Sequence, residues 1–169
     1  AFWQHGSVCE NYEDIQCAVY AVGGWADGYS NAVPRMLEGL KCPKKGLVGP
    51  WAHKYPNFAL PGPRIGFLQE TLRWWDYWLK DIDTGIMEES QYRVWMQDSA
   101  PPATQYQIRS GRWVAEPSWP SEHIRWEKSY LNQKRLTEHA GEAEQIPIHT
   151  PQTMGARQGE WCGHGLDPD

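Results

Sequence analysis

The sequence lacks several features that would assign it to a common protein class. No apolar stretch among its 169 residues approaches the roughly 18 residues of a membrane-spanning helix. The N-terminal segment AFWQHGSVCE has neither the basic nor the apolar region of a signal peptide, so we expect a cytoplasmic protein that is not bound to a membrane. Its 16 basic residues are outnumbered by 21 acidic residues, which argues against a nucleic-acid-binding surface.

The cysteines also lack a pattern that would indicate metal binding. The sequence has four of them and no CxxC spacing: Cys9, Cys17, Cys42 and Cys162. Because Cys17 falls inside an expected buried strand, we predict free thiols and not disulfides. Cys162, His164 and Asp167 are close in sequence, but no second pair of ligands stands at zinc-like spacing. We therefore predict no metal site.

Large aromatic side chains are abundant instead. The sequence contains eleven tryptophans and eight tyrosines. Each such ring buries a large area and is also suited to line a pocket for an apolar ligand. The aromatic content is therefore consistent with a dense core and with an aromatic-walled binding site.

Two short apolar segments predict neighbouring strands of a parallel sheet. Residues 17–22 (CAVYAV) form a continuous apolar run without alternation, which is typical of a strand buried on both faces. Residues 46–51 (GLVGPW) have the same character. The segment between them begins with capping residues and an early proline, and its apolar side chains follow helical spacing, which predicts a crossover helix: Ser30, Asn31, Pro34, and then Val33, Met36, Leu37 and Leu40.

An acidic and a basic side chain follow these two strands. Asp27 comes after the first strand and His53 just after the second. Since neighbouring parallel strands end at the same edge of a sheet, we expect the two side chains to lie close together. An aspartate after one strand and a histidine after the next is how a Ser, Asp, His catalytic triad ends. A turn role for Asp27 and a simple loop position for His53 are the alternative.

The second half of the sequence changes in character. A helix that covers one face of the sheet is predicted by an apolar stripe with spacings of 3, 4, 3 and 4 residues: Ile65, Leu68, Leu72, Trp75 and Leu79. After an acidic segment at 81–90, residues 105–109 and 124–127 alternate with period two, which predicts antiparallel strands. We expect an α/β part at 1–90 and a β-rich part at 91–169.

Four segments, in this order, resemble the cocaine-esterase and X-Pro dipeptidyl-peptidase family of serine hydrolases (S15-like, CocE/NonD): GGWADGYSN, GPWAH, WWDYWLKD and SGRWVAEPSWPS. The resemblance extends over about residues 10–135 and more weakly to the end of the sequence. It implies an α/β plus β fold class. Residues 1–90 would form the C-terminal part of an α/β-hydrolase domain, and residues 91–169 the start of a jelly-roll β-sandwich domain. The family's reaction requires no cofactor or metal ion.

The resemblance places Asp27 on the family's triad aspartate and His53 on its triad histidine. The family's nucleophile lies in a G-x-S-x-G motif well before the aspartate, and this sequence contains no such motif around Ser7, Ser30 or any other serine. We therefore expect a fragment that lacks the nucleophile half and is inactive alone. A non-catalytic binding or interaction module built on the β-rich half is the alternative function.

The resemblance also bears on the substrate, which we expect to be a small ester or amide. Tyr29 matches an aromatic position that lines the acyl pocket of cocaine-esterase-like members, and Trp25 and Trp51 are candidate substrate-binding residues whose alternative role is core packing. Family members that hydrolyse α-amino-acid esters carry acidic residues where this sequence has Tyr29 and Ser30, so a free-amine substrate is disfavoured. Unpaired strand edges invite pairing with another copy, and we expect such a contact, and hence a homo-oligomer, along residues 17–22.

Overall fold

The computed structural model describes residues 2–103, 105–132, 135–143, 145 and 147–154. They divide into two compact units, one that extends to Glu122 and one that begins at His123. The first unit opens with three short helical turns: α1 (Phe2–His5), η1 (Val8–Glu10) and η2 (Tyr12–Asp14).

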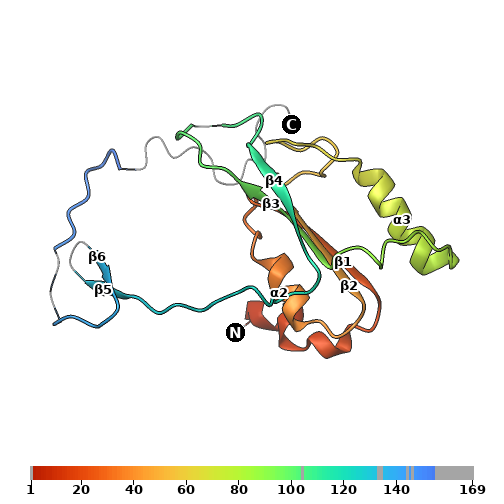
Figure 1. Ribbon diagram of the computed structural model, residues 1–169, viewed down its shortest axis with the longest axis horizontal. Helices are drawn as coiled ribbons and strands as arrows, with labels where there is room; N and C mark the ends of the chain where they lie inside the picture. The colour runs from red at the N-terminus through yellow and green to blue at the C-terminus, as the bar shows by residue number, and fades with distance from the viewer. Residues whose placement is uncertain (1, 104, 133–134, 144, 146, 155–169) are drawn as a thin grey trace. The chain divides into compact units, whose positions relative to one another are not determined.

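The first unit is built on a four-stranded mixed sheet with the strand order β1-β2-β3-β4 (Figure 1). β1 (Val19–Gly24), β2 (Lys44–Gly49) and β3 (Tyr92–Gln97) are parallel, and β4 (Gly111–Glu116) pairs with β3 in the antiparallel direction. The two expected parallel strands are confirmed, although each begins and ends two residues away from its expected bounds. The mixed α/β character of the fold is thus confirmed for this unit.

Helices pack on the two faces of this sheet. α2 (Ala32–Gly39) is the expected crossover helix, and Val33 and Leu37 on its buried side join a core with Val48 of β2. The helix α3 (Phe67–Lys80) covers the other face, where the Trp74 ring lies 5.2 Å from the ring of Tyr20. Successive side chains of β1 and β2 point to opposite faces, so each strand contributes to both cores.

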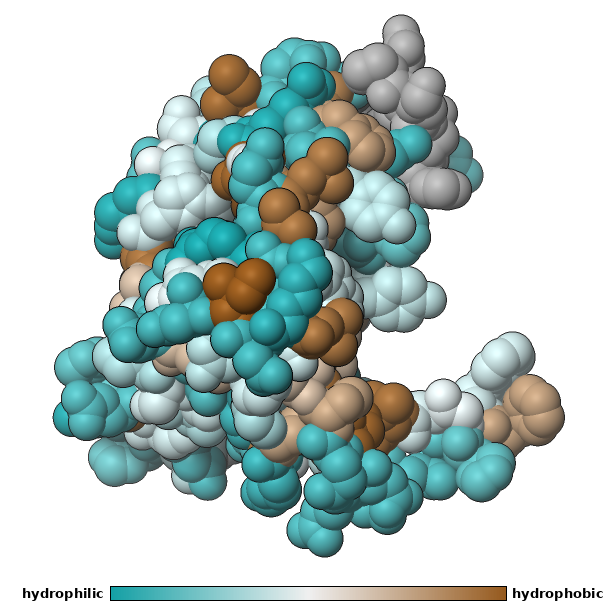
Figure 2. Space-filling model, turned by 90° about the vertical axis from the view of Figure 1, so that its right-hand side faces the viewer, coloured by the Kyte–Doolittle hydropathy of each residue, from teal (hydrophilic) through white to brown (hydrophobic). Residues whose placement is uncertain are grey.

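The apolar stripe of α3 does not cover the sheet as the sequence predicts. The buried residues of α3 are Glu70 and Trp74. The four residues of the expected stripe that lie on the helix are more than half exposed: Leu68, Leu72, Trp75 and Leu79. α3 lies on the side of the first unit that is turned to the viewer in Figure 2, where apolar side chains are exposed among hydrophilic ones. The helix is confirmed, but the side on which it meets the sheet is different.

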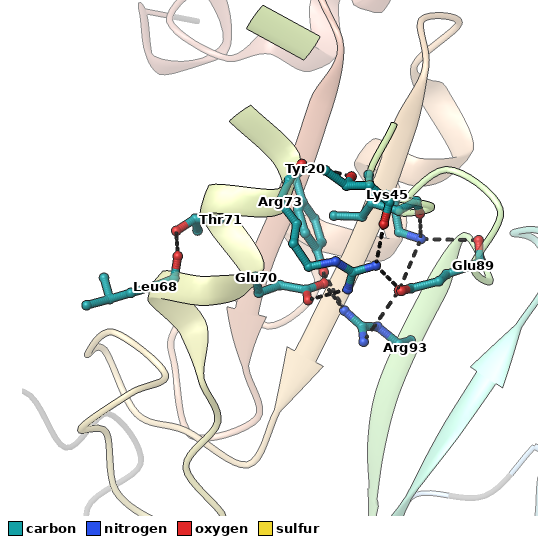
Figure 3. A network of polar contacts seen from close by, with 10 residues as sticks. Tyr20, Lys45, Leu68, Glu70, Thr71, Arg73, Glu89 and Arg93 are labelled. Carbon is teal, nitrogen blue, oxygen red and sulfur yellow. Dashed lines mark hydrogen bonds and ion pairs between the residues drawn. The ribbon is translucent and has the colours of Figure 1, made fainter. Parts of the chain in front are cut away.

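A buried glutamate explains the orientation of α3. Glu70 accepts a hydrogen bond of 2.7 Å from the Tyr20 hydroxyl and forms an ion pair with Arg93 of β3 (Figure 3). An unpaired buried carboxylate would be costly, so these partners fix which side of the helix faces the strands. Apolar periodicity alone does not contain this information.

The acidic segment after α3 is tied to the sheet through the same network (Figure 3). The side chain of Lys45 is 2% exposed, and its ammonium donates hydrogen bonds to the carbonyls of Ile86 at 2.7 Å and Glu89 at 3.1 Å. Burial lowers the pKa of Lys45, which the nearby Glu89 carboxylate partly opposes. Arg73 of α3 forms an ion pair with the same glutamate. Residues 84–89 are therefore a fixed part of the first unit.

The sheet continues across residue 90, where we expect one domain to give way to the next. Residues 46–48 of β2 pair directly with residues 92–94 of β3. The two compact units divide after Glu122. The division into 1–90 and 91–169 stays a prediction.

The expected strands at 105–109 and 124–127 are wrong. Ile108 makes only an isolated bridge, to Gly62, and β4 begins further along the chain, at Gly111. A Cβ at Gly111 would lie 2.2 Å from the carbonyl oxygen of Met96, so this glycine permits the close approach of β4 to β3. Alternation by itself does not form a strand where no neighbouring strand is available to pair with it.

The described residues of the second unit contain one small antiparallel sheet. It consists of β5 (Tyr130–Asn132) and β6 (Arg135–Thr137), with Leu131 opposite Leu136. The jelly roll stays a prediction.

Free thiols are confirmed for the three cysteines that the structure describes, Cys9, Cys17 and Cys42. Cys17 is exposed and precedes β1, contrary to its expected place inside the strand. The described ranges contain no group of three or more potential metal ligands, and Cys162, His164 and Asp167 lie outside them. No helix in the described part of the chain is both long and apolar enough to cross a membrane.

Tyr92 makes the stability of the first unit sensitive to alkaline pH. Burial raises the pKa of this tyrosine, which is 3% exposed, from 10.0 to about 12. Its contribution to stability is therefore complete below pH 10, and it is lost as the pH rises to 12, because the unfolded chain releases the proton first. We expect a loss on the order of 2 kcal/mol in the free energy of unfolding relative to Tyr92→Phe. Urea unfolding of both proteins from pH 9 to 12 measures this difference, and parallel pH curves would contradict the assignment.

Candidate active site

Asp27 and His53 meet at one edge of the sheet. Asp27 lies in the loop after β1 and His53 in the loop after β2, and these two strands are parallel neighbours. The Nδ1 atom of His53 is 2.8 Å from the Oδ2 atom of Asp27. The expected proximity of the two side chains is confirmed, and their catalytic role stays a prediction.

Backbone hydrogen bonds hold the two loops together. The amide of Ala26 donates to the carbonyl of Trp51 at 3.1 Å, and the amide of Asp27 donates to the carbonyl of Gly24 at 3.2 Å. A Cβ at Gly24 would lie only 2.0 Å from the Trp51 carbonyl oxygen, so a glycine is required for this close approach. The backbone therefore places the Asp27 carboxylate opposite the loop that carries His53.

The two side chains differ in exposure and in hydrogen bonding. The side chain of Asp27 is 15% exposed, and its Oδ1 atom accepts a hydrogen bond of 2.9 Å from the amide of Tyr29. The imidazole of His53 is 53% exposed. If the Nδ1 atom of His53 carries the proton that points to Asp27, the basic lone pair lies on Nε2. The pair has the geometry of a general base with its orienting carboxylate.

Trp51 is part of the hydrophobic core. It is 1% exposed, packs with Leu47 and Ala59, and donates a hydrogen bond of 2.8 Å from its Nε1 atom to the carbonyl of Pro63. This packing is the alternative role stated for Trp51 above. Its expected part in substrate binding stays a prediction.

Trp25 and Tyr29, the other two expected substrate-binding residues, lie outside the walls of a hollow that the structure forms beside His53. The indole of Trp25 is 37% exposed and donates from its Nε1 atom to the carbonyl of Trp95 at 2.6 Å. The side chain of Tyr29 is 75% exposed. Neither residue lines that hollow, and their roles stay predictions.

A hollow of about 510 Å³ lies beside the Asp27 and His53 pair, which forms part of its lining. This volume is in the range of small-molecule binding sites. Its walls are mostly apolar: Val22, Trp51, Tyr55, Pro56, Phe58 and Phe67. Sequence reasoning missed Tyr55, Phe58 and Phe67. The one signal for Tyr55 and Phe58 was their position shortly after His53, in a loop without regular periodicity.

Comparisons with known proteins agree on a hydrolase family. The family model of X-Pro dipeptidyl-peptidase (S15 family) matches residues 1–55, a segment that contains both Asp27 and His53. No curated protein matches the chain. Among solved structures, the crystal structure of a CocE/NonD family hydrolase from Staphylococcus aureus is similar in fold, with a TM-score of 0.57 at 13% sequence identity. The match covers 82% of this chain and 23% of the hydrolase.

These matches support the resemblance to the S15-like, CocE/NonD hydrolases that the sequence predicts. The chain spans less than a quarter of the length of the hydrolase that it matches. The activity and the substrates of a whole protein are therefore matters for a proposal.

Proposed function

We propose that these 169 residues are part of a serine hydrolase of the cocaine-esterase and X-Pro dipeptidyl-peptidase type, which cleaves esters or amides through an acyl-enzyme. The observation that carries the proposal is the 2.8 Å contact between His53 and Asp27 at the ends of neighbouring parallel strands. Both residues lie within the segment that matches the S15 family model.

In this proposal His53 acts first as a base and then as an acid. Its Nε2 atom takes the proton of a serine hydroxyl as the oxygen attacks the substrate carbonyl, and it returns that proton to the leaving group. A water molecule activated in the same way then hydrolyses the acyl-enzyme. Asp27 holds the imidazole in the required tautomer and stabilises the imidazolium that forms.

The proposal places the nucleophile and the oxyanion-hole donors outside these 169 residues. The sequence has no G-x-S-x-G motif, and the chain matches 23% of the similar hydrolase. We also propose that the antiparallel strands β5 and β6 begin the jelly-roll domain of this family. β3 and β4 lie after residue 90 as well, but they continue the sheet of β1 and β2.

Labelling with a fluorophosphonate tests this function, because the reagent phosphonylates an activated serine. We expect the natural full-length protein to be labelled on one serine of a G-x-S-x-G motif and to lose p-nitrophenyl acetate hydrolysis in parallel. The 169-residue chain alone serves as the control and is expected to be neither labelled nor active. A full-length protein that is neither labelled nor active would favour a binding module instead.

A further inference from the structure

We propose that Tyr55, Phe58 and Phe67 form the binding wall for an uncharged apolar group of the substrate, either an aromatic ring or a branched alkyl group. The inference rests on the proposed hydrolase function and assigns the specificity of the same site. It differs from the expectation that Trp25 and Tyr29 surround the substrate. Neither of these residues lines the hollow beside His53, whereas the three aromatic residues do.

The three rings form a continuous apolar surface. The Tyr55 ring stacks with the Phe67 ring at 6.2 Å between centroids and 26° between planes, and it meets the Phe58 ring edge-on at 6.1 Å. Tyr55 and Phe58 remain 66% and 46% exposed, although both have apolar rings. A preformed, solvent-exposed aromatic surface in a hollow is typical of a binding site for an apolar ligand.

The loop that carries the wall is fixed by its own backbone. The amides of Phe58 and Ala59 both donate to the carbonyl of Tyr55 at 3.0 Å, and the amide of Ile65 donates to the carbonyl of Pro56 at 3.1 Å. Ala59 is fully buried against the core. The rings are therefore held in place before a ligand arrives, which reduces the entropy lost on binding.

The lining disfavours a positively charged group, because it contains the cation Lys54 and few acidic side chains. Asp27 is the only carboxylate that lines the hollow in the described part of the chain, and it already accepts hydrogen bonds from His53 and from the amide of Tyr29. An ammonium group bound there would have no other carboxylate in the lining to pair with. An uncharged apolar group instead binds favourably, because it moves out of water and packs against the rings.

The position of the wall relative to His53 links it to catalysis. Tyr55 follows His53 by two residues, and both line the same hollow. A substrate whose apolar group rests on the rings therefore has its reactive bond within the same hollow as the imidazole. Positioning of this kind raises kcat/KM for substrates whose apolar group packs against the wall.

The experiment compares matched substrates on the full-length protein. The acyl side is varied with p-nitrophenyl benzoate against p-nitrophenyl acetate, and the alcohol side with benzyl acetate against ethyl acetate. We expect Phe58→Ala and Phe67→Ala to lower kcat/KM for the aromatic member of at least one pair by about 10-fold relative to its small partner. Phe58→Leu should retain most of the preference. Trp75→Ala is the matched control, because this ring is exposed on α3 and does not line the hollow.

The outcomes separate this inference from the function on which it rests. If both alanine variants affect the aromatic and the small substrates equally, or not at all, while His53→Ala still abolishes turnover, the wall is not the specificity site and the hydrolase function stands. If His53→Ala leaves turnover intact, the proposed function fails and the wall assignment fails with it. Near-ultraviolet circular dichroism and thermal unfolding verify that each variant is folded.

Discussion

Replacing His53 with alanine in the full-length protein is expected to lower kcat for p-nitrophenyl acetate and butyrate by about 10³-fold or more. The variant removes the group that takes the serine proton, and no other described histidine lines the hollow. Because the imidazole is 53% exposed, its loss should change the free energy of unfolding little. A large kinetic effect with unchanged stability is therefore the signature of a catalytic group.

Asp27→Asn should produce a loss of similar size, about 10³- to 10⁴-fold in kcat. The amide is nearly isosteric with the carboxylate, but it stabilises the wrong tautomer of His53 and does not compensate the charge of the imidazolium. His5→Ala and Asp14→Asn are matched controls, since both residues are exposed and lie outside the hollow. Retention of activity in either the His53 or the Asp27 variant, with folding intact, would leave these two residues with structural roles and would favour the binding module.

Trp51→Ala is expected to cause the largest loss of stability, about 3–5 kcal/mol in the free energy of unfolding. Trp51 is 1% exposed, and its Nε1 atom donates to the carbonyl of Pro63, so the substitution leaves a cavity and an unpaired acceptor. The ring packs between the end of β2 and the loop that carries the aromatic wall. Its loss should therefore also loosen the site.

Urea unfolding of the full-length protein measures this effect. Trp75→Ala provides the control, because it removes the same side chain from a position that is 51% exposed and should cost about 1 kcal/mol or less. The free energy of unfolding of Trp51→Phe should lie between those of the wild type and Trp51→Ala, because the phenyl ring fills part of the cavity. Equal losses in Trp51→Ala and Trp75→Ala would contradict the core role of Trp51.

The sequence alone determined the central part of the fold and the candidate pair. Continuous apolar runs predicted β1 and β2, helical spacing predicted α2, and the order of the elements placed Asp27 and His53 at one sheet edge. These features could be predicted because each depends on local pattern and on the geometry of a parallel crossover. The proximity of the two side chains follows from that geometry, whereas the 2.8 Å contact also depends on the hydrogen bond between the two loops.

Tertiary structure alone decided which side of α3 faces the sheet. The 3, 4 spacing of its apolar residues correctly predicted a helix, but the ion pair of Glu70 with Arg93 turns the opposite side inward. The two partners are 23 residues apart in the sequence, so no local sequence pattern predicts that they pair. The same limit applies to β4, which depends on the close approach of Gly111 to β3 and not on alternation.

The aromatic wall was also decided by tertiary structure. Tyr55 and Phe58 lie in an irregular loop, and Phe67 begins a helix nine residues later, so no periodicity connects the three. They form one surface because the buried Ala59 and the hydrogen bond between Ile65 and Pro56 fold the loop back beside His53. Local pattern determined β1, β2, α2 and the catalytic candidates, whereas contacts between distant residues decided what surrounds them.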